Sequence, residues 1–387
     1  MFKKLSLLNK LILMMLGAAL LMAAGTALWV SQGLKTLDVP GQLKQPQLFA
    51  VPQGTAFSQV ARQLEQQNLV PDSLWLRVYG RLHPQQTLVK AGEYEFIDGQ
   101  SPKNMLQMMI DGDTKHWALQ FIEGWTFADV RKALAAAPRL QQKTADWSNA
   151  EIMTAVGADG EHPEGWFFPD TYLFISSNSD LDVLQRSFDR MQSVLAEEWA
   201  ARAADLPYKT PYEALIMASI VERETGAAHE REQVAGVFVR RMHKGMRLQT
   251  DPTVIYGMGS QYKGRITRKD LQTHTPYNTY RIDGLPPTPI ALAGREAIHA
   301  ALHPADGKAL FFVARGDGTH TFSNTLAQHQ RAVRQFQLNR RSDYRSSPAP
   351  VEDATESTSV QQEVQEVQEV QEVQEIQEIQ EKQEKQP

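Results

Sequence analysis

MASIVERET, at residues 217–225, is an apolar run that ends in carboxylates. A helix that is apolar almost all round belongs inside a domain, so we expect this segment to be a buried helix. Burying an ionised carboxylate is costly, and packing alone therefore does not explain Glu222 and Glu224. A dry setting and the negative end of the helix dipole both raise the pKa of a carboxyl group. The stretch thus predicts a carboxylic acid that stays protonated near neutral pH, the property that a general acid needs.

Composition narrows the class of protein. The chain has 387 residues and a formal net charge of -5, and its length suggests two or three domains. A nucleic-acid-binding protein would normally have a basic surplus, so this charge argues against one. The absence of cysteine excludes structural disulfides and cysteine-based zinc sites.

The N-terminus predicts a membrane anchor. Residues 11–30, LILMMLGAALLMAAGTALWV, carry no charge and are long enough to span a bilayer as one helix. Lys3, Lys4 and Lys10 precede them, which predicts residues 1–10 in the cytoplasm. A cleaved signal peptide is the alternative, but the apolar run is longer than a usual signal core. We therefore expect an uncleaved single-pass helix in the inner (cytoplasmic) membrane, with the rest of the chain outside the cytoplasm, in the periplasm.

A small domain is predicted at residues 48–115, after a polar linker at 31–47. Its pattern is strand, helix, helix, strand, and the helices are marked by apolar residues at helical spacing. These four elements are expected at 48–51, 56–67, 72–82 and 89–96. The order resembles a LysM domain, a module associated with N-acetylglucosamine polymers. A spacer domain without a ligand is the alternative.

The predicted fold class is α+β. Residues 116–341 are expected to form a mixed α+β domain that is dense in helices. An aromatic, proline-rich segment at 162–172 interrupts the helical pattern, and we expect it to be irregular. Residues 342–387 are rich in Gln and Glu, and the Val and Ile of their triplets drift round a helix because three does not match 3.6. We expect this tail to be disordered.

Several ordered motifs follow the apolar run. They lie at residues 218–225, 245–257, 275–280, 284–290, 303–305 and 320–329. Together they resemble the YceG-like family, from the membrane anchor to about residue 335. The tail has no counterpart in that resemblance.

The resemblance implies a lytic transglycosylase, a lyase that cleaves peptidoglycan glycan strands internally. Such an enzyme cuts between N-acetylmuramic acid and N-acetylglucosamine, and the C6 hydroxyl of the muramoyl residue closes on its own anomeric carbon to leave a 1,6-anhydro end. One carboxyl group can first protonate the leaving oxygen and then remove the proton from that hydroxyl. A single glutamate can therefore suffice where most glycoside hydrolases need two carboxylates.

The same resemblance makes Glu224 the expected catalytic residue. Glu224 follows Val221 by three positions and Ile220 by four, so it extends an apolar stripe. The alternative is a solvated helix-end carboxylate paired with a base such as Arg223 or Arg231. Glu222 falls on another face, where it is expected to orient the site or pair with an arginine.

Supporting roles are expected from polar residues in the other motifs. Gln249, Thr250 and Asp251 come at a turn fixed by Pro252, and such groups bind sugar hydroxyls. Asp251 has an alternative role as the N-cap of a helix that begins at Thr253.

The later motifs contribute four more candidates. Asn278 and Tyr280 are expected to place an N-acetyl group, to stabilise the transition state, or merely to hold their loop. His320 and Asn324 lie near Phe322 at a spacing that matches no metal site. We predict no metal and no cofactor.

Two other functions compete with the transglycosylase. A muramidase-type hydrolase would pair Glu224 with a second carboxylate such as Asp251. A non-catalytic scaffold would bind glycan or peptidoglycan synthases. Because an anchored enzyme reaches only strands near the membrane, we expect nascent strands as the substrate and termination of strand elongation as the outcome.

Overall fold

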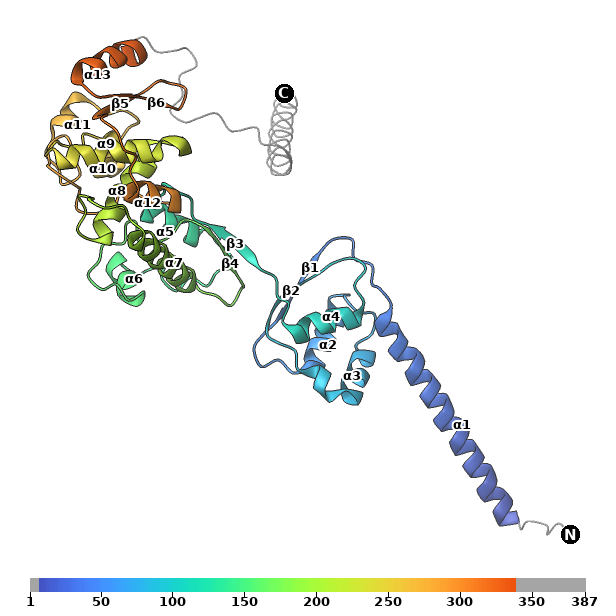
Figure 1. The fold of residues 1–387 in the computed structure, drawn as a ribbon. Helices are drawn as coiled ribbons and strands as arrows, with labels where there is room; N and C mark the ends of the chain where they lie inside the picture. Colours follow the sequence, from blue (N-terminus) through green and yellow to red (C-terminus); the bar gives the residue numbers. More distant parts are fainter. Residues whose placement is uncertain (1–6, 339–387) are drawn as a thin grey trace, which may run out of the picture.

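The computed structural model describes residues 7–338 (Figure 1). The tail predicted at 342–387 and residues 1–6 lie outside the described residues. Within them, the chain forms one long N-terminal helix, a small domain, and a larger helix-rich part that carries two short antiparallel strand pairs. The mixed α+β class expected from the sequence is confirmed.

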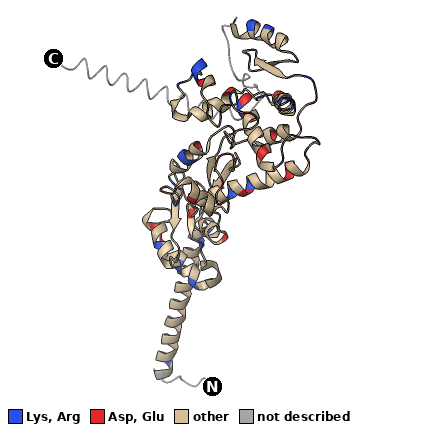
Figure 2. Ribbon diagram, turned by 90° about the vertical axis from the view of Figure 1, so that its left-hand side faces the viewer, with Lys and Arg blue, Asp and Glu red and all other residues tan. Residues whose placement is uncertain are grey.

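Helix α1 (Leu7–Lys35) extends away from the rest of the chain in Figure 1. It is long and apolar enough to cross a membrane, with a mean hydropathy of 2.2 in its most apolar window, and Figure 2 shows no charge along most of its length. The polar linker predicted at 31–47 is wrong over its first part. The helix continues to Lys35 and a 3-10 turn, η1 (Thr36–Asp38), follows, because Leu34 and Leu37 pack against the core of the small domain.

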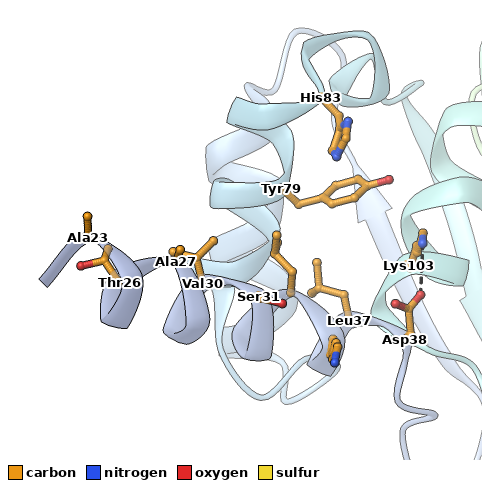
Figure 3. Close-up of a pocket in the computed structure, with 12 residues that line it drawn as sticks. Ala23, Thr26, Ala27, Val30, Ser31, Leu37, Asp38, Tyr79, His83 and Lys103 are labelled. Carbon is orange, nitrogen blue, oxygen red and sulfur yellow. Dashed lines mark hydrogen bonds and ion pairs between the residues drawn. The ribbon is translucent and has the colours of Figure 1, made fainter. Parts of the chain in front are cut away.

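The end of α1 is fixed to the small domain by close packing. A Cβ on Gly33 would lie 2.2 Å from the ring of Trp75, so only glycine allows this approach. Trp29, one turn earlier, contacts Trp75 edge-on at 4.7 Å between ring centroids. A cavity of about 790 Å³ is lined by α1 and by side chains of the small domain that include Tyr79 and His83 (Figure 3). Helix α1 therefore meets the small domain through a close-packed joint.

The small domain has the predicted order of strand, helix, helix and strand. Its core lies between an antiparallel strand pair, in which Phe49 lies opposite Tyr94, and three helices. The third helix was not predicted, and Ser101 caps its first turn. The elements are β1 (Gln47–Val51), α2 (Phe57–Gln66), α3 (Ser73–Leu82), η2 (Pro84–Thr87), β2 (Gly92–Phe96) and α4 (Pro102–Asp111).

A second core follows, and its strand pair links it to the small domain. Glu93 of β2 accepts hydrogen bonds from Trp117 Nε1 at 3.2 Å and from Arg139 Nη1 at 3.1 Å. The segment expected to be irregular at 162–172 has no regular structure up to Asp170, and the second strand begins at Thr171. The elements are β3 (Trp117–Gln120), antiparallel to β4 (Thr171–Phe174), with α5 (Phe127–Ala135), α6 (Asn149–Ala155) and α7 (Asp180–Ala200).

The third core is centred on α8 (Pro211–Glu224), the helix predicted from the apolar run. All residues from 214 to 221 are buried. Thr210 caps its first turn by accepting from Glu213 N, and Pro211 takes the first helical position. Ser219 is satisfied inside this core, because its Oγ donates to Ile216 O and accepts from Ile290 N.

The remaining elements pack around α8 and end in a strand pair with a covering helix. Helix α12 lies against α8, and α9 contacts both of them. They are η3 (Ala228–Glu230), α9 (Arg231–His243), α10 (Asp251–Met258), η4 (Gly259–Gln261), α11 (Arg268–Gln272), α12 (Arg295–Leu302), β5 (Phe311–Ala314), antiparallel to β6 (His320–Ser323), α13 (Leu326–Val333) and a π-turn, η5 (Arg334–Leu338).

The joint between α1 and the small domain is testable with one methyl group. Gly33→Ala should move α1 away from Trp75, because the added Cβ overlaps the indole ring. The distance between spin labels at cysteines replacing Leu28 and Leu82 should shift and broaden, and the chain has no native cysteine to interfere. Gly25→Ala is the matched control, because nothing lies within 4 Å of its added Cβ. Equal distance distributions for both variants would contradict the close-packed joint.

Candidate active site

A cavity of about 540 Å³ lies where the end of α8 meets the β5–β6 pair and α13. Five residues predicted from the sequence line it, and they come from separate parts of the chain. These are Glu224, Gln249, Asp251, Tyr280 and His320. The fold therefore brings most of the predicted polar residues to one place.

Glu224 is the last residue of α8, and its carboxyl group faces the cavity. Its Oε1 accepts a short hydrogen bond from the Thr250 hydroxyl. Burial raises the pKa of Glu224 to about 7; the Thr250 hydrogen bond opposes this rise and the charge of Asp251 adds to it. The arginine pairing considered from the sequence is not formed, since Arg223 instead donates to Gly124 O. Glu224 is thus a carboxyl group whose protonated form persists to a higher pH than that of an ordinary glutamate.

The turn that carries Thr250 is held in a conformation that few residues adopt. Gln249 has a φ of 55°, in the left-handed region that favours glycine. Its backbone N–H donates to Thr279 O at 3.2 Å, and the next N–H, of Thr250, donates to Thr279 Oγ1 at 3.0 Å. Arg241 donates to the Gln249 side chain at 2.5 Å. These bonds fix the position from which Thr250 contacts Glu224.

Asp251 is not the N-cap that the sequence allowed. Thr250 occupies the cap position of α10, and Asp251 is the first helical residue. Its Oδ1 accepts from the Tyr280 hydroxyl at 2.7 Å. Burial raises the pKa of Tyr280, and the charge of Asp251 raises it further, so Tyr280 is a hydrogen-bond donor at any physiological pH.

His320 enters the cavity wall with a partner that the sequence did not suggest. Its Nδ1 lies 2.8 Å from Glu230 Oε2, and its backbone N–H donates to Glu230 Oε1 at 2.9 Å. Both side chains are buried. Glu230 is ninety positions earlier in the chain, and no local pattern connects it with His320.

Three other cavity residues were also missed as site residues. Arg241 is buried, and Phe311 lies under its guanidinium group, 5.5 Å from ring centroid to Cζ. His329 stacks on the same ring at 5.2 Å. The histidine lies in one of the sequence motifs, which is the only signal that could have identified it.

Four predicted site residues lie outside the cavity lining, and one of them, Thr250, still contacts Glu224. Glu222 accepts from Gly294 N at 3.1 Å and lies 3.9 Å from Arg231, which fits its expected pairing with an arginine. Asn278 donates to three backbone carbonyls, of residues 270, 271 and 273, so it holds its loop. The side chain of Asn324 is exposed.

A second carboxyl group with a raised pKa lies in the interior. Burial raises the pKa of Glu164 to about 7. Both of its oxygens are used, because they accept from Phe127 N at 2.8 Å and from the Tyr256 hydroxyl at 2.9 Å. Glu164 is 4% exposed and does not line the cavity. It ties α5 to α10, and a raised pKa alone therefore does not identify the acid.

One group of possible metal ligands occurs among the described residues. Atoms of Glu198, His299 and His303 lie within 4.8 Å of one another. The Glu198 oxygens are already engaged, by Arg295 Nη1 at 2.8 Å and His299 Nδ1 at 2.9 Å. A guanidinium group at that distance repels a cation, so we interpret the cluster as a hydrogen-bonded tie between α7 and α12.

The model of the YceG-like family matches residues 49–335, most of the chain. The chain belongs to the YceG-like family. The resemblance expected from the motifs is thereby confirmed. A relative from Bacillus subtilis (strain 168), named endolytic murein transglycosylase, is 27% identical over 303 residues, which are 74% of this chain and 83% of the relative.

Two further relatives complete the comparison. An endolytic murein transglycosylase of Streptococcus pneumoniae serotype 2 is 24% identical over 335 residues, 77% of this chain and 59% of the relative. A solved structure, a putative yceG-like protein of Listeria monocytogenes, is 28% identical and has a TM-score of 0.48, with 75% of this chain and 99% of that chain covered.

The raised pKa of Glu224 makes stability depend on pH. The pKa of Glu224 is about 7 in the folded state and 4.5 ordinarily, so the stability that this group contributes below pH 4.5 is lost as the pH rises to 7. Glu224→Gln removes this loss. The melting temperature of the variant minus that of the parent should therefore increase from pH 5 to pH 8. Glu232→Gln, at an exposed position of α9, is the control and should show no such trend. A pH-independent difference for Glu224→Gln would contradict the assignment.

Proposed function

We propose that this chain is an endolytic murein transglycosylase with Glu224 as its single acid and base. The observation that carries the proposal is one protonatable carboxyl group, held by Thr250, in a cavity shared with Asp251 and Tyr280. The names of the relatives support the same activity. Peptidoglycan glycan strands are the substrate.

The reaction uses Glu224 twice. Its carboxyl group donates a proton to the oxygen between the muramoyl anomeric carbon and the next N-acetylglucosamine, and that carbon–oxygen bond breaks. The carboxylate then takes the proton of the muramoyl C6 hydroxyl, whose oxygen bonds to the anomeric carbon. No water is consumed, Glu224 is protonated again, and one product carries a 1,6-anhydromuramoyl end.

Asp251 supplies negative charge to the same cavity. A carboxylate there stabilises the positive charge that develops at the anomeric carbon in the transition state. The hydrogen bond from Tyr280 fixes its orientation. The muramidase alternative would instead require Asp251 to activate a water molecule or attack the sugar. The family and its named relatives favour the transglycosylase.

The location of the site follows from α1. We propose that α1 is a single-pass anchor, with the lysines at positions 3, 4 and 10 on the cytoplasmic side and the catalytic domain, residues 116–341, on the periplasmic side. The close-packed joint at Gly33 keeps the small domain near the membrane surface. Nascent strands are then the accessible substrate, their synthases are the expected partners, and cleavage terminates strand elongation. Residues 48–115 are a LysM-like domain that holds the glycan.

Mass spectrometry of peptidoglycan fragments tests the reaction. The purified protein should release fragments with 1,6-anhydromuramoyl ends, and Glu224→Gln should lower their formation by at least about 100-fold, the size expected for loss of a general acid. Glu222→Gln is the matched control, because Glu222 lies two positions before Glu224 on the same helix but outside the cavity lining. Reducing ends would instead identify a hydrolase, and cleavage that survives Glu224→Gln would exclude this acid.

The pH dependence of kcat/KM tests how the pKa of Glu224 is set. Activity should fall above pH about 7, because Glu224 must enter the reaction protonated. Thr250→Val removes the bond that lowers this pKa, so the alkaline limb should move to higher pH. Asp251→Asn removes the charge that raises it, so the limb should move to lower pH. Shifts in the same direction would contradict the assigned causes.

A further inference from the structure

The cavity wall contains a buried positive charge that no carboxylate balances. Arg241 is 7% exposed, and among the described residues no carboxylate oxygen lies within 4.0 Å of its guanidinium nitrogens. Its bonds go to neutral groups: Nη1 to Leu248 O at 3.1 Å and Nη2 to Gln249 Oε1 at 2.5 Å. Burial of a charge without a counter-ion is costly, so a function is expected for it.

Two buried nitrogen atoms at this place have no hydrogen-bond partner in the described part of the protein. One is Nε of the Arg241 guanidinium group itself, and the other is His329 Nδ1. Both residues line the cavity that contains Glu224, and both contact the ring of Phe311. Burial and the charge of Arg241 lower the pKa of His329, which keeps its imidazole neutral. Buried polar groups are nearly always hydrogen-bonded, and two exceptions in one cavity wall indicate a ligand.

We infer that Arg241 and His329 form an anion subsite that binds a carboxylate of the glycan strand. The inference rests on the proposed function. A guanidinium group binds carboxylates through charged, directional hydrogen bonds, and three of the five N–H groups of Arg241, one on Nε and one on each Nη, have no partner among the described residues. The carboxylate is a free lactyl group on strands without peptides, or a peptide carboxylate on strands with stems.

The subsite would decide which bond of the strand is cut. N-acetylglucosamine units are neutral, whereas each muramoyl unit carries the lactyl group to which the peptide is attached. Binding that side of the sugar next to Arg241 places a muramoyl residue, and never its neutral neighbour, at a fixed distance from Glu224. The structure thus assigns Arg241 a role in setting the register of the strand.

Binding to a cleavage-dead protein tests this role. In the full-length Glu224→Gln chain, affinity is measured for a tetrasaccharide of alternating N-acetylglucosamine and N-acetylmuramic acid with free lactyl carboxylates, and for neutral chitotetraose. The parent should prefer the anionic ligand, and Arg241→Gln should lower affinity for it by about 10- to 100-fold, as for loss of a charged hydrogen bond. Affinity for chitotetraose should stay within about twofold, which also shows that the variant is folded.

The control separates charge recognition from support of the Gln249 turn. Arg240→Gln changes the neighbouring arginine of α9, whose guanidinium also donates to carbonyls, of Ala305 and Ala309, but does not line the cavity. It should leave the preference unchanged. Equal losses for both ligands in Arg241→Gln, or no preference in the parent, would overturn the subsite.

Two further arms keep the conclusions separate. A tetrasaccharide with stem peptides has no free lactyl carboxylate. If Arg241→Gln lowers the affinity for this ligand too, the subsite binds peptide carboxylates. If Arg241→Gln lowers only the affinity for the peptide-free ligand, the subsite binds the lactyl group. Both results require the anion subsite. Because binding is measured without cleavage, reducing ends from the unmutated protein would refute the transglycosylase while leaving the preference of the subsite intact.

Discussion

The contact between Glu224 and Thr250 is the interaction on which the site depends. It joins the end of a largely buried helix, α8, to a turn that begins the next helix but one, α10. Because α8 is apolar and buried from 214 to 221, the backbone of its last residue is held at the edge of the core. The carboxyl group must be satisfied where it stands, and the hydroxyl of Thr250 does so while leaving the other oxygen for a substrate.

A raised pKa is necessary for this role but does not define it. Glu164 and Glu224 are both raised to about 7 by burial. The oxygens of Glu164 are consumed by Phe127 and Tyr256, so its proton cannot reach a ligand. Glu224 has one hydrogen-bond partner for its side chain among residues 7–338, and it faces a cavity. Access to the proton, which depends on geometry, distinguishes an acid from a structural tie.

Arg241 serves both the turn and the cavity. Its two Nη groups hold Leu248 and Gln249, where the backbone adopts a left-handed conformation that costs energy in a residue with a side chain. Its Nε and the second N–H of each Nη have no hydrogen-bond partner in the described part of the protein. Neutral donors could support the turn without the free energy that desolvating a charge costs. The donors that remain explain why a charge is used.

The sequence by itself predicted several of the elements, and through the family resemblance it made Glu224 the candidate acid. The apolar run at 217–221 predicted a buried helix, the 3.6-residue spacing predicted α2 and α3, and the charge-free residues 11–30 predicted a helix long enough to span a membrane, since these features depend on local hydrophobic pattern. Tertiary structure alone decided which polar residues meet. Asp251 and Tyr280, or His320 and Glu230, are far apart in the chain, and their pairing depends on how α8, α10 and the β5–β6 pair pack. The partner of Glu224, the exclusion of Asn324 and the unbalanced charge of Arg241 follow from that packing, because burial and distance are properties of the folded chain.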